Sequence, residues 1–287
     1  MQQNKSPLVS VIIPTYNSAR TLETTLKSVK DQTYPNIEMI VVDNQSKDTT
    51  RQIAEKYADV VYTKWPERTA QKNYGIEKAK GDYFLFIDWD MSLDKELITD
   101  CVQQIQQDSQ NWGVVIPVVD TGSSFWTKVI AFERSFYKWS AIEAARFLDA
   151  NLVKRVWGFK DIVCYEEFIV PQQIEKLWYR TKNYTNFNIY HDYDDFTFSL
   201  NLKKKFYYGK SLNLYKEQMK SLWLNLASDK QTSILNRYMI FLKEKRFWSH
   251  PLLALGVLFL KTCEFWAGGL GVIFSMISKI VIKHKKI

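Results

Sequence analysis

The first 120 residues alternate short apolar segments with amphipathic ones, and this alternation constrains the fold more than any other feature of the chain. Runs rich in β-branched residues, the pattern of buried strands, occur at 8–13, 37–43, 59–63, 82–88 and 113–119. Segments with apolar residues at helical spacing lie between them, at 19–32, 48–57, 69–80 and 94–109. Strands that alternate with helices in this way predict right-handed βαβ crossovers. We therefore expect an α/β fold with a mostly parallel sheet flanked by helices.

The pattern becomes less regular after residue 120. Residues 124–146 mix aromatic and charged side chains, which predicts one or two amphipathic helices. The following segments predict a strand at 147–153, a loop at 156–159, a helical stretch at 164–180 and a last short strand at 187–191. Residues 201–247 are basic and are expected to be helical.

Polar residues follow three of the predicted strands. Tyr16 and Asn17 come after the first, Asp43 ends the second, and Asp88 ends the fourth. Ligands of open parallel sheets bind beyond the carboxyl ends of the strands. The sequence therefore predicts that these side chains meet on one ligand-binding rim.

Charge is distributed unevenly along the chain. Of 39 Lys+Arg and 31 Asp+Glu, residues 1–200 hold 23 and 27 (net −4), and residues 201–287 hold 16 and 4 (net +12). Such a basic segment is typical of proteins that bind nucleic acid or an anionic membrane.

The three cysteines, Cys101, Cys164 and Cys263, form no CxxC pair, which argues against a zinc ribbon or a disulfide framework.

The basic segment also carries two apolar runs, 251–260 and 265–278, separated by the sequence KTCE. Neither run reaches the roughly 20 residues that span a bilayer. Lys-rich sequences flank both ends, at 243–246 and 283–286. A shallow hairpin, two helices in the membrane plane, or a single span from 265 to 282 would satisfy this pattern. We expect association with an anionic membrane surface and no nucleic-acid partner.

The carboxylates of Asp88 and Asp90 are the strongest chemical signal. They leave the end of a buried strand at positions i and i+2, so both can reach one cation in the turn. Carboxylate oxygens are the ligands that Mg²⁺ and Mn²⁺ prefer. The sequence therefore predicts a divalent-metal site that uses Mn²⁺ or Mg²⁺.

Several motifs together resemble family-2 glycosyltransferases, which are inverting enzymes with the GT-A nucleotide-sugar fold. The resemblance covers about residues 8–200 and rests on VSVIIPTYN (9–17), VVDNQSKDTT (41–50), QKNYGIEKAKGDYFLFIDWD (71–90), WGF (157–159) and YEEF (165–168). It implies transfer of a sugar from a nucleoside diphosphate donor to an acceptor hydroxyl. It also implies that the α/β domain is of the Rossmann-like GT-A type.

The resemblance assigns donor-binding roles by position. It implies contacts with the nucleotide sugar from Pro14, Tyr16, Asn17, Asp43, Ser46, Lys72, Asn73 and Asp88. Asp43 matches the acid that receives the imide N–H of uracil, and Asp90 matches the direct metal ligand. Two positions depart from the family pattern. Residues 43–46 read Asp-Asn-Gln-Ser where acidic-acidic-Gly-Ser is usual, and Lys72 stands where Arg is common.

The acceptor side is assigned in the same way. Glu167 falls where the family's general base stands, with Glu166 orienting it or an acceptor hydroxyl. The turn Trp157-Gly158-Phe159 is expected to contact the acceptor. His191 follows a strand inside the catalytic region and is a candidate for the metal shell or the diphosphate.

Together these features predict three segments: a nucleotide-sugar-binding half at 1–120, a half with the acceptor site and base at 121–200, and the basic helical tail at 201–287. The expected enzyme transfers a hexosyl or N-acetylhexosaminyl group, most simply from a UDP-sugar, to a lipid-linked or other membrane-associated glycan. The first apolar run is too short for a secretory signal, so we expect the cytoplasmic face of the cell membrane. The alternatives are a polyprenyl-phosphate glycosyltransferase and a catalytically degraded membrane scaffold.

Overall fold

A computed structural model describes residues 6–138, 143–159, 166–179, 181–222 and 234–284. The chain divides into two compact units. Unit 1 comprises 1–119, 138–161 and 166–192, and unit 2 comprises 120–137, 162–165 and 193–287. Each unit is described by itself below. The boundaries at residues 120 and 200 remain predictions from the sequence.

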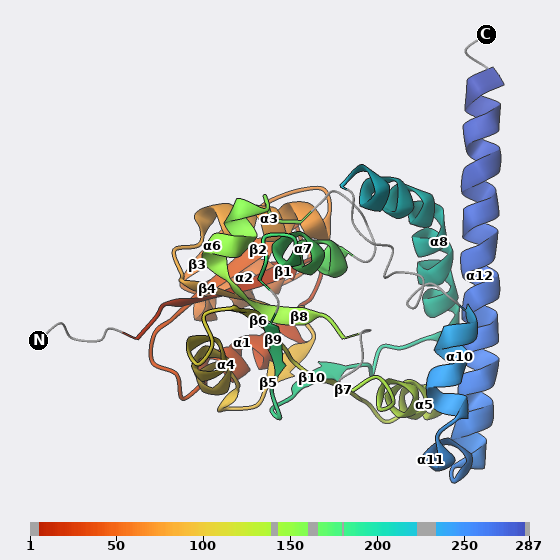
Figure 1. Cartoon of the computed structure of the whole chain (residues 1–287), viewed down its shortest axis with the longest axis horizontal. Helices are drawn as coiled ribbons and strands as arrows, with labels where there is room; N and C mark the ends of the chain where they lie inside the picture. Colours follow the sequence, from red (N-terminus) through yellow and green to blue (C-terminus); the bar gives the residue numbers. More distant parts are fainter. Residues whose placement is uncertain (1–5, 139–142, 160–165, 180, 223–233, 285–287) are drawn as a thin grey trace, which may run out of the picture. The chain divides into compact units, whose positions relative to one another are not determined.

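Unit 1 is built on a seven-stranded sheet in the order β3-β2-β1-β4-β8-β6-β9. The strands are β1 (Val9–Thr15), β2 (Ile37–Asp43), β3 (Val60–Thr63), β4 (Tyr83–Phe86), β6 (Asn111–Val115), β8 (Ala145–Asp149) and β9 (Thr181–Tyr184). Strands β1 to β4 pair in parallel, and β8 runs antiparallel to both β4 and β6. A mostly parallel α/β sheet, as predicted, is therefore confirmed (Figure 1).

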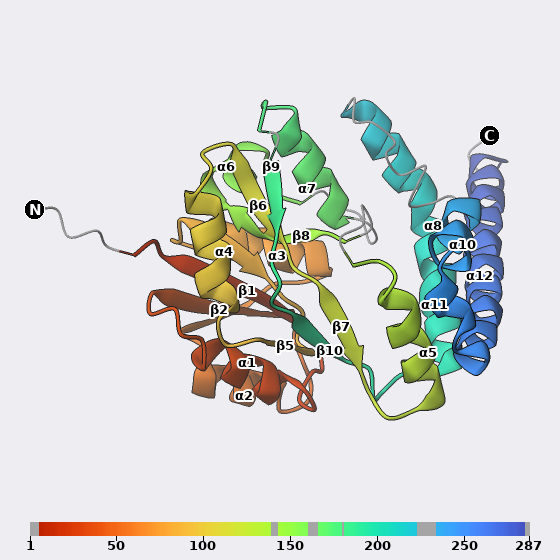
Figure 2. The same cartoon turned by 60° about the horizontal axis from the view of Figure 1, so that its bottom comes forward.

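Helices cover both faces of this sheet because consecutive strand residues point to opposite faces. Residues Val11, Ile13, Val41 and Leu85 pack on one side against α1 (Leu22–Lys30), α2 (Thr50–Tyr57) and α4 (Leu97–Gln106). Residues Ile12, Ile40 and Phe86 pack on the other side against α3 (Arg68–Lys78), α6 (Ala150–Arg155) and α7 (Glu166–Glu175). Figure 2 shows these two helical layers. The two cores hold the carboxyl ends of β1, β2 and β4 in fixed register.

A second sheet has the order β5-β10-β7 and contains β5 (Met91–Leu93), β7 (Val118–Thr121) and β10 (Ile189–Asp192). Strand β10 pairs antiparallel with β5, with His191 opposite Met91. The predicted strand at 113–119 is thus two strands, β6 and β7, which lie on either side of Pro117. Proline lacks the N–H that a continuous ladder needs.

The predicted strand at 147–153 is wrong in its second half. Strand β8 ends at Asp149, and α6 begins at Ala150. The Asp149 carboxylate accepts a hydrogen bond of 2.9 Å from the Leu152 backbone N–H, which is an N-cap. The N-cap starts a helix at Ala150, although the apolar run that predicted a strand continues to residue 153.

Unit 2 is helical and contains α5 (Phe125–Arg134), α8 (Phe198–Ser221), α10 (Ile234–Leu242), α11 (Lys245–Trp248) and α12 (Pro251–His284). Its core consists of Val129, Phe241, Phe247, Ala254, Val257 and Leu260. Among the described residues, only α12 is long and apolar enough to cross a membrane by length and composition.

Residues 251–284 form one continuous helix, so the hairpin and the two separate helices considered above are wrong. The charged residues between the apolar runs do not interrupt α12 because they are paired inside unit 2. The Lys261 ammonium lies 2.5 Å from Glu264 and 2.9 Å from Glu133. Paired in this way, buried charges are tolerated within a helix that is otherwise apolar.

Helices α8 and α12 approach closely at glycines. A Cβ placed on Gly209 would lie 2.1 Å from the carbonyl oxygen of Gly268, and one on Gly271 would lie 2.1 Å from that of Phe206. A Cβ on Gly269 would meet no atom within 4 Å. Only the first two glycines are therefore needed for packing.

We predict that Gly209→Ala lowers the free energy of unfolding of unit 2 by about 1–3 kcal/mol, because its methyl group forces the two backbones apart. Gly269→Ala is the matched control. It should be neutral or stabilise by about 0.5–1 kcal/mol, because alanine is the better helix former. Denaturant melts of the full chain measure both changes. Equal effects of the two substitutions would contradict the close helix crossing.

Candidate active site

The first part of the site lies where β1 and β2 end. Thr15 and Asp43 are register partners at the last position of the two strands. Asp43 is 2% exposed. Its carboxylate accepts hydrogen bonds from the Ser46 backbone N–H (2.9 Å), the Ser46 hydroxyl (2.5 Å) and the Thr15 hydroxyl (3.2 Å). Oδ1 accepts both hydroxyl hydrogen bonds and Oδ2 accepts the backbone one, so the protein positions both oxygens and Oδ2 keeps a lone pair for a ligand.

The turn after β1 is joined to the turn after β2. The Asn17 backbone N–H donates to the Ser46 hydroxyl (2.8 Å), and the Asn17 side chain accepts from the Lys47 N–H (2.9 Å). Asn17 has a φ of 47°, a left-handed conformation that asparagine tolerates better than most residues. Pro14 is buried within β1, whereas the Tyr16 side chain is half exposed. The structure thus brings Tyr16, Asn17, Asp43 and Ser46 together, as the sequence predicts.

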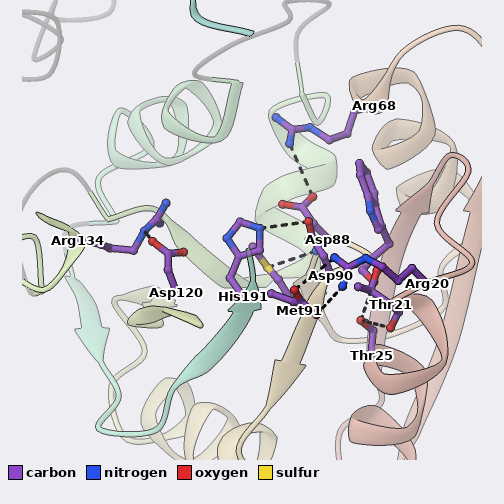
Figure 3. A network of polar contacts seen from close by, with 12 residues as sticks. Arg20, Thr21, Thr25, Arg68, Asp88, Asp90, Met91, Asp120, Arg134 and His191 are labelled. Atoms are coloured by element: carbon purple, nitrogen blue, oxygen red, sulfur yellow. Dashed lines mark hydrogen bonds and ion pairs between the residues drawn. The ribbon is translucent and has the colours of Figure 1, made fainter. Parts of the chain in front are cut away.

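The second part of the site lies at the end of β4, where Asp88 and Asp90 follow the strand in a turn (Figure 3). The turn is closed by the Met91 N–H, which donates to the Asp88 carbonyl (3.3 Å). His191 approaches from β10, and its Nε2 lies 3.2 Å from Asp90 Oδ2. The predicted grouping of Asp88, Asp90 and His191 is therefore present in the structure.

Two arginines that the sequence analysis did not single out face Asp88. A guanidinium nitrogen of Arg68, in the first turn of α3, lies 3.8 Å from Oδ1. One of Arg146, from β8, lies 3.9 Å from Oδ2. The sequence could have predicted Arg68, because it lies four residues before Lys72 and therefore on the same face of the helix. None existed for Arg146, because its place beside Asp88 depends on the antiparallel pairing of β8 with β4.

The positive charges around Asp88 set its ionisation. Burial alone would raise the pKa of the Asp88 carboxyl, but the surrounding charges outweigh burial and hold the pKa well below its usual range. The contributing groups, in decreasing order, are Arg68, Lys72, Arg146 and His191. Asp88 is therefore a carboxylate throughout the neutral range.

Asp88 and Asp90 fit a divalent metal ion. Within the described residues, the buried Oδ1 atoms of both carboxylates accept no hydrogen bond. No three His, Cys, Asp or Glu side chains of that part of the chain form a group that could hold a metal ion alone. Mg²⁺ and similar ions are commonly held by one or two carboxylates together with substrate phosphates. Two orphan carboxylate oxygens therefore suit a metal whose remaining ligands come from a phosphorylated substrate.

A salt bridge fixes the backbone beside Asp90. The two guanidinium NH groups of Arg20 donate to the two oxygens of Asp192, at 3.1 and 3.3 Å. The Asp192 N–H in turn donates to the Asp90 carbonyl (2.8 Å). Arg20 and Asp192 were not predicted as site residues, and their pairing links two segments that are 172 residues apart.

Helix α3 carries the two predicted residues Lys72 and Asn73. Lys72 is 4% exposed, and its ammonium lies 5.1 Å from the centre of the Phe159 ring. The Gln71 side chain anchors the helix by donating to the carbonyls of Thr15 (2.9 Å) and Val42 (2.5 Å). Lys72 is thereby held where its charge acts on Asp88.

The Asn73 side chain is engaged by the turn at Trp157-Gly158-Phe159. Its Oδ1 accepts from the Phe159 N–H (2.8 Å), and its Nδ2 donates to the Phe159 carbonyl (2.8 Å). Trp157 and Gly158 have φ values of 65° and 64°, and the Trp157 indole is 85% exposed. Phe159 instead packs edge-on against Phe86 in the core. Of the predicted acceptor residues, Trp157 is thus the one that projects into solvent.

The predicted base lies at the start of α7. Glu166 and Glu167 are its first two residues, and the Glu167 side chain is partly exposed. A carboxylate in the first turn of a helix is stabilised by the helix dipole. The Glu166 side chain and residues 160–165 lie outside the described part of the chain.

The family described as glycosyl transferase family 2 matches residues 10–206, which is more than half of the chain. The chain therefore belongs to glycosyltransferase family 2.

Curated relatives agree with this assignment over a limited length. A putative teichuronic acid biosynthesis glycosyltransferase of Bacillus subtilis, TuaG, is 43% identical over 94 residues, 30% of this chain and 37% of that protein. The glycosyltransferase GlyG of Streptococcus pneumoniae is 34% identical over 109 residues, 36% of each chain. The chain thus spans about a third of the length of the curated relatives it matches.

Solved structures share the fold. TarS 1–349 of S. aureus, in complex with UDP-GlcNAc, has a TM-score of 0.57 at 20% identity, over 87% of this chain and 79% of that one. The mannosyltransferase PcManGT of Pyrobaculum calidifontis, in complex with GDP-Man and Mn²⁺, has a TM-score of 0.57 at 18% identity, over 97% and 81%. The GT-A type fold expected from the sequence is therefore confirmed.

We predict that Asn73→Ala loosens the Trp157–Phe159 turn, because it removes both hydrogen bonds to Phe159. Amide hydrogen exchange at Phe159 should accelerate about 5- to 150-fold, which corresponds to a loss of about 1–3 kcal/mol for the two bonds. The exposed Glu77→Gln on the same helix is the control. Unchanged exchange at Phe159 in Asn73→Ala would show that the turn is held by other contacts.

Proposed function

We propose that the protein transfers a sugar from a nucleoside diphosphate sugar, with a UDP-sugar as the preferred donor, in a reaction that requires Mn²⁺ or Mg²⁺ and inverts the anomeric centre. The observation that carries this proposal is the pair of partly buried carboxylates, Asp88 and Asp90, which lie beside clustered cations. One buried oxygen of each accepts no hydrogen bond from the described residues. The donors named for the two structural neighbours, UDP-GlcNAc and GDP-Man, are both nucleoside diphosphate sugars and support this donor class.

On this proposal, the rim at β1 and β2 binds the nucleoside, with Asp43 accepting the imide N–H of uracil. Pro14 shapes the end of β1, Tyr16 and Asn17 line the base, and Ser46 orients the Asp43 carboxylate. Asp88 and Asp90, with His191 beside Asp90, hold the metal ion. When bound, the metal neutralises negative charge that develops on the diphosphate leaving group.

The cations near Asp88 serve the same leaving group. Arg68, Lys72 and Arg146 lower the pKa of Asp88 by their charge. The two arginines lie 3.8 and 3.9 Å from the Asp88 carboxylate, which is beyond hydrogen-bonding distance. We propose that their positive charge would also stabilise the phosphates of the bound donor. In the usual family pattern, an arginine stands at the position of Lys72. We propose that Lys72 and Arg68, one helical turn away, together supply the charge of that arginine.

Glu167 is proposed as the general base that takes the proton of the acceptor hydroxyl, with Glu166 orienting it or the acceptor. Trp157 offers an exposed aromatic face on which a sugar of the acceptor can stack. Asn73, Gly158 and Phe159 hold that turn in place. In this scheme residues 1–120 provide the donor half of the site and residues 121–200 the acceptor half.

The acceptor is proposed to be a lipid-linked or other membrane-associated glycan, reached at the cytoplasmic face of the cell membrane. The apolar helix α12 and the net charge of +12 over residues 201–287 support an anionic membrane surface as the place of work.

We predict that Asp90→Asn weakens the Mn²⁺-dependent part of UDP binding at least about tenfold, the scale expected when a metal site is damaged. Calorimetric titration of UDP with Mn²⁺ and with EDTA measures this part directly. Asp31→Asn, an exposed change of the same charge, is the control. A Mn²⁺-dependent affinity equal to that of the wild type would contradict the metal assignment.

We predict that Glu167→Gln retains UDP binding and lowers kcat by about 10²–10⁴, the usual contribution of a general base. The amide keeps the shape of the side chain but cannot accept the proton. Glu175→Gln, on the exposed surface of the same helix, is the control. If Glu166→Gln loses activity and Glu167→Gln does not, the two proposed roles are reversed.

A further inference from the structure

One side of α12 carries a row of exposed apolar side chains, which is broken at one turn by the exposed Thr262. The row, called here the apolar stripe, consists of Leu252, Leu255, Phe259, Trp266, Leu270 and Ile273. Successive members are three, four or seven residues apart, so they lie on one helix face. At 1.5 Å per residue, the stripe is about 32 Å long.

The opposite face of α12 is occupied by protein. Ala254, Val257 and Leu260 belong to the core of unit 2. The next residue, Lys261, pairs with Glu133 and Glu264. Glu264 also accepts a hydrogen bond of 2.7 Å from the Asn201 side chain and lies 3.5 Å from the Lys205 ammonium. Over residues 251–278, whose side chains the structure describes, the apolar side chains exposed to solvent therefore lie on one side of α12.

Helix α8 lies along α12 in the same direction. Asn201 contacts Glu264, Gly209 contacts Gly268, and the Lys210 ammonium lies 5.2 Å from the centre of the Phe274 ring. Residues 201–210 are therefore level with residues 264–274. The side chains of Lys203, Lys204 and Lys210 are exposed on this part of α8.

This arrangement does not suit a helix that crosses a bilayer. A crossing α12 would carry the exposed lysines of α8 into the hydrocarbon, at about 2.5–3.5 kcal/mol for each at the bilayer centre. A helix that lies along the surface avoids this cost, because it inserts only the stripe and leaves the lysines among the headgroups.

We infer that α12 lies in the plane of an anionic phospholipid bilayer, with the apolar stripe inserted at the boundary between headgroups and acyl chains. The net charge of +12 over residues 201–287 favours anionic lipid over a second copy of the same basic segment. This inference deepens the membrane part of the proposed function and needs no donor, acceptor or transfer. Its failure would therefore be distinct from failure of the glycosyltransferase proposal.

Cosedimentation of the full chain with vesicles of phosphatidylcholine and phosphatidylglycerol (7:3) tests the stripe. Leu255→Asp and Leu270→Asp, near its two ends, should each lower the partition coefficient at least tenfold. The exposed Gln107→Glu, with the same change of charge in unit 1, should leave it within twofold. Binding that is equal in all four proteins would overturn the inference. So would light scattering that shows a wild-type dimer in solution and monomeric aspartate variants, because a second copy would then cover the stripe.

Orientation is tested with peptide tags at the two ends of the chain in sealed membrane vesicles. A helix in the membrane plane leaves both tags on one side, so added protease removes both from vesicles of one orientation and neither from the other. A crossing helix places the tags on opposite sides, so protease removes one tag from each kind of vesicle. The second result would overturn the inference even if the vesicle-binding result held.

Discussion

An ionised carboxylate at the end of a buried strand is the constraint on which the active site depends. Asp88 follows β4 between β1 and β8, where solvent cannot fully stabilise its charge. A buried charge without partners costs several kcal/mol, so cations must converge on it. Arg68 and Lys72 come from α3, and Arg146 comes from β8. The sheet order that brings these elements together therefore also assembles the positively charged cluster around Asp88, where we propose that the phosphates of the donor bind.

Local pattern was enough to predict the half of the site that lies on consecutive βα units. Tyr16, Asn17, Asp43 and Asp88 each follow a strand whose apolar run is plain in the sequence, and parallel pairing aligns those strand ends. Arg146 and the Arg20–Asp192 pair depend on pairing between segments distant in sequence, which no local pattern records. Strand β5 was missed because it is only three residues long, and β9 because its sequence, Thr-Lys-Asn-Tyr, contains no apolar run. The sequence predicts that Asn73 lies near the donor, and the structure shows that its side chain also holds the turn at Phe159 through hydrogen bonds. The two roles are compatible, because one side chain can hold a turn and face a ligand.

In unit 2, ion pairs allow charged residues to lie inside a helix that is otherwise apolar. The sequence KTCE looks like an interruption between two apolar runs, yet Lys261 and Glu264 lie within one helix of 34 residues. Their partners, Glu133 on α5 and Lys205 on α8, are 128 and 59 residues away in sequence. The same network separates a protein-facing side of α12 from its exposed apolar side. Composition predicts association with a membrane, and the distribution of buried charge supports the proposed orientation of α12 along its surface.

The central claim is that Asp88 and Asp90 hold a divalent ion that also binds the diphosphate of the donor. Electron paramagnetic resonance of Mn²⁺ with the protein and UDP tests this claim most directly, because free hexaaquo Mn²⁺ and ³¹P couplings are both visible. The account predicts that wild-type protein depletes the free Mn²⁺ signal in the presence of UDP and that the bound ion shows ³¹P hyperfine coupling. A protein that binds UDP while the signal of free Mn²⁺ stays unchanged would contradict it.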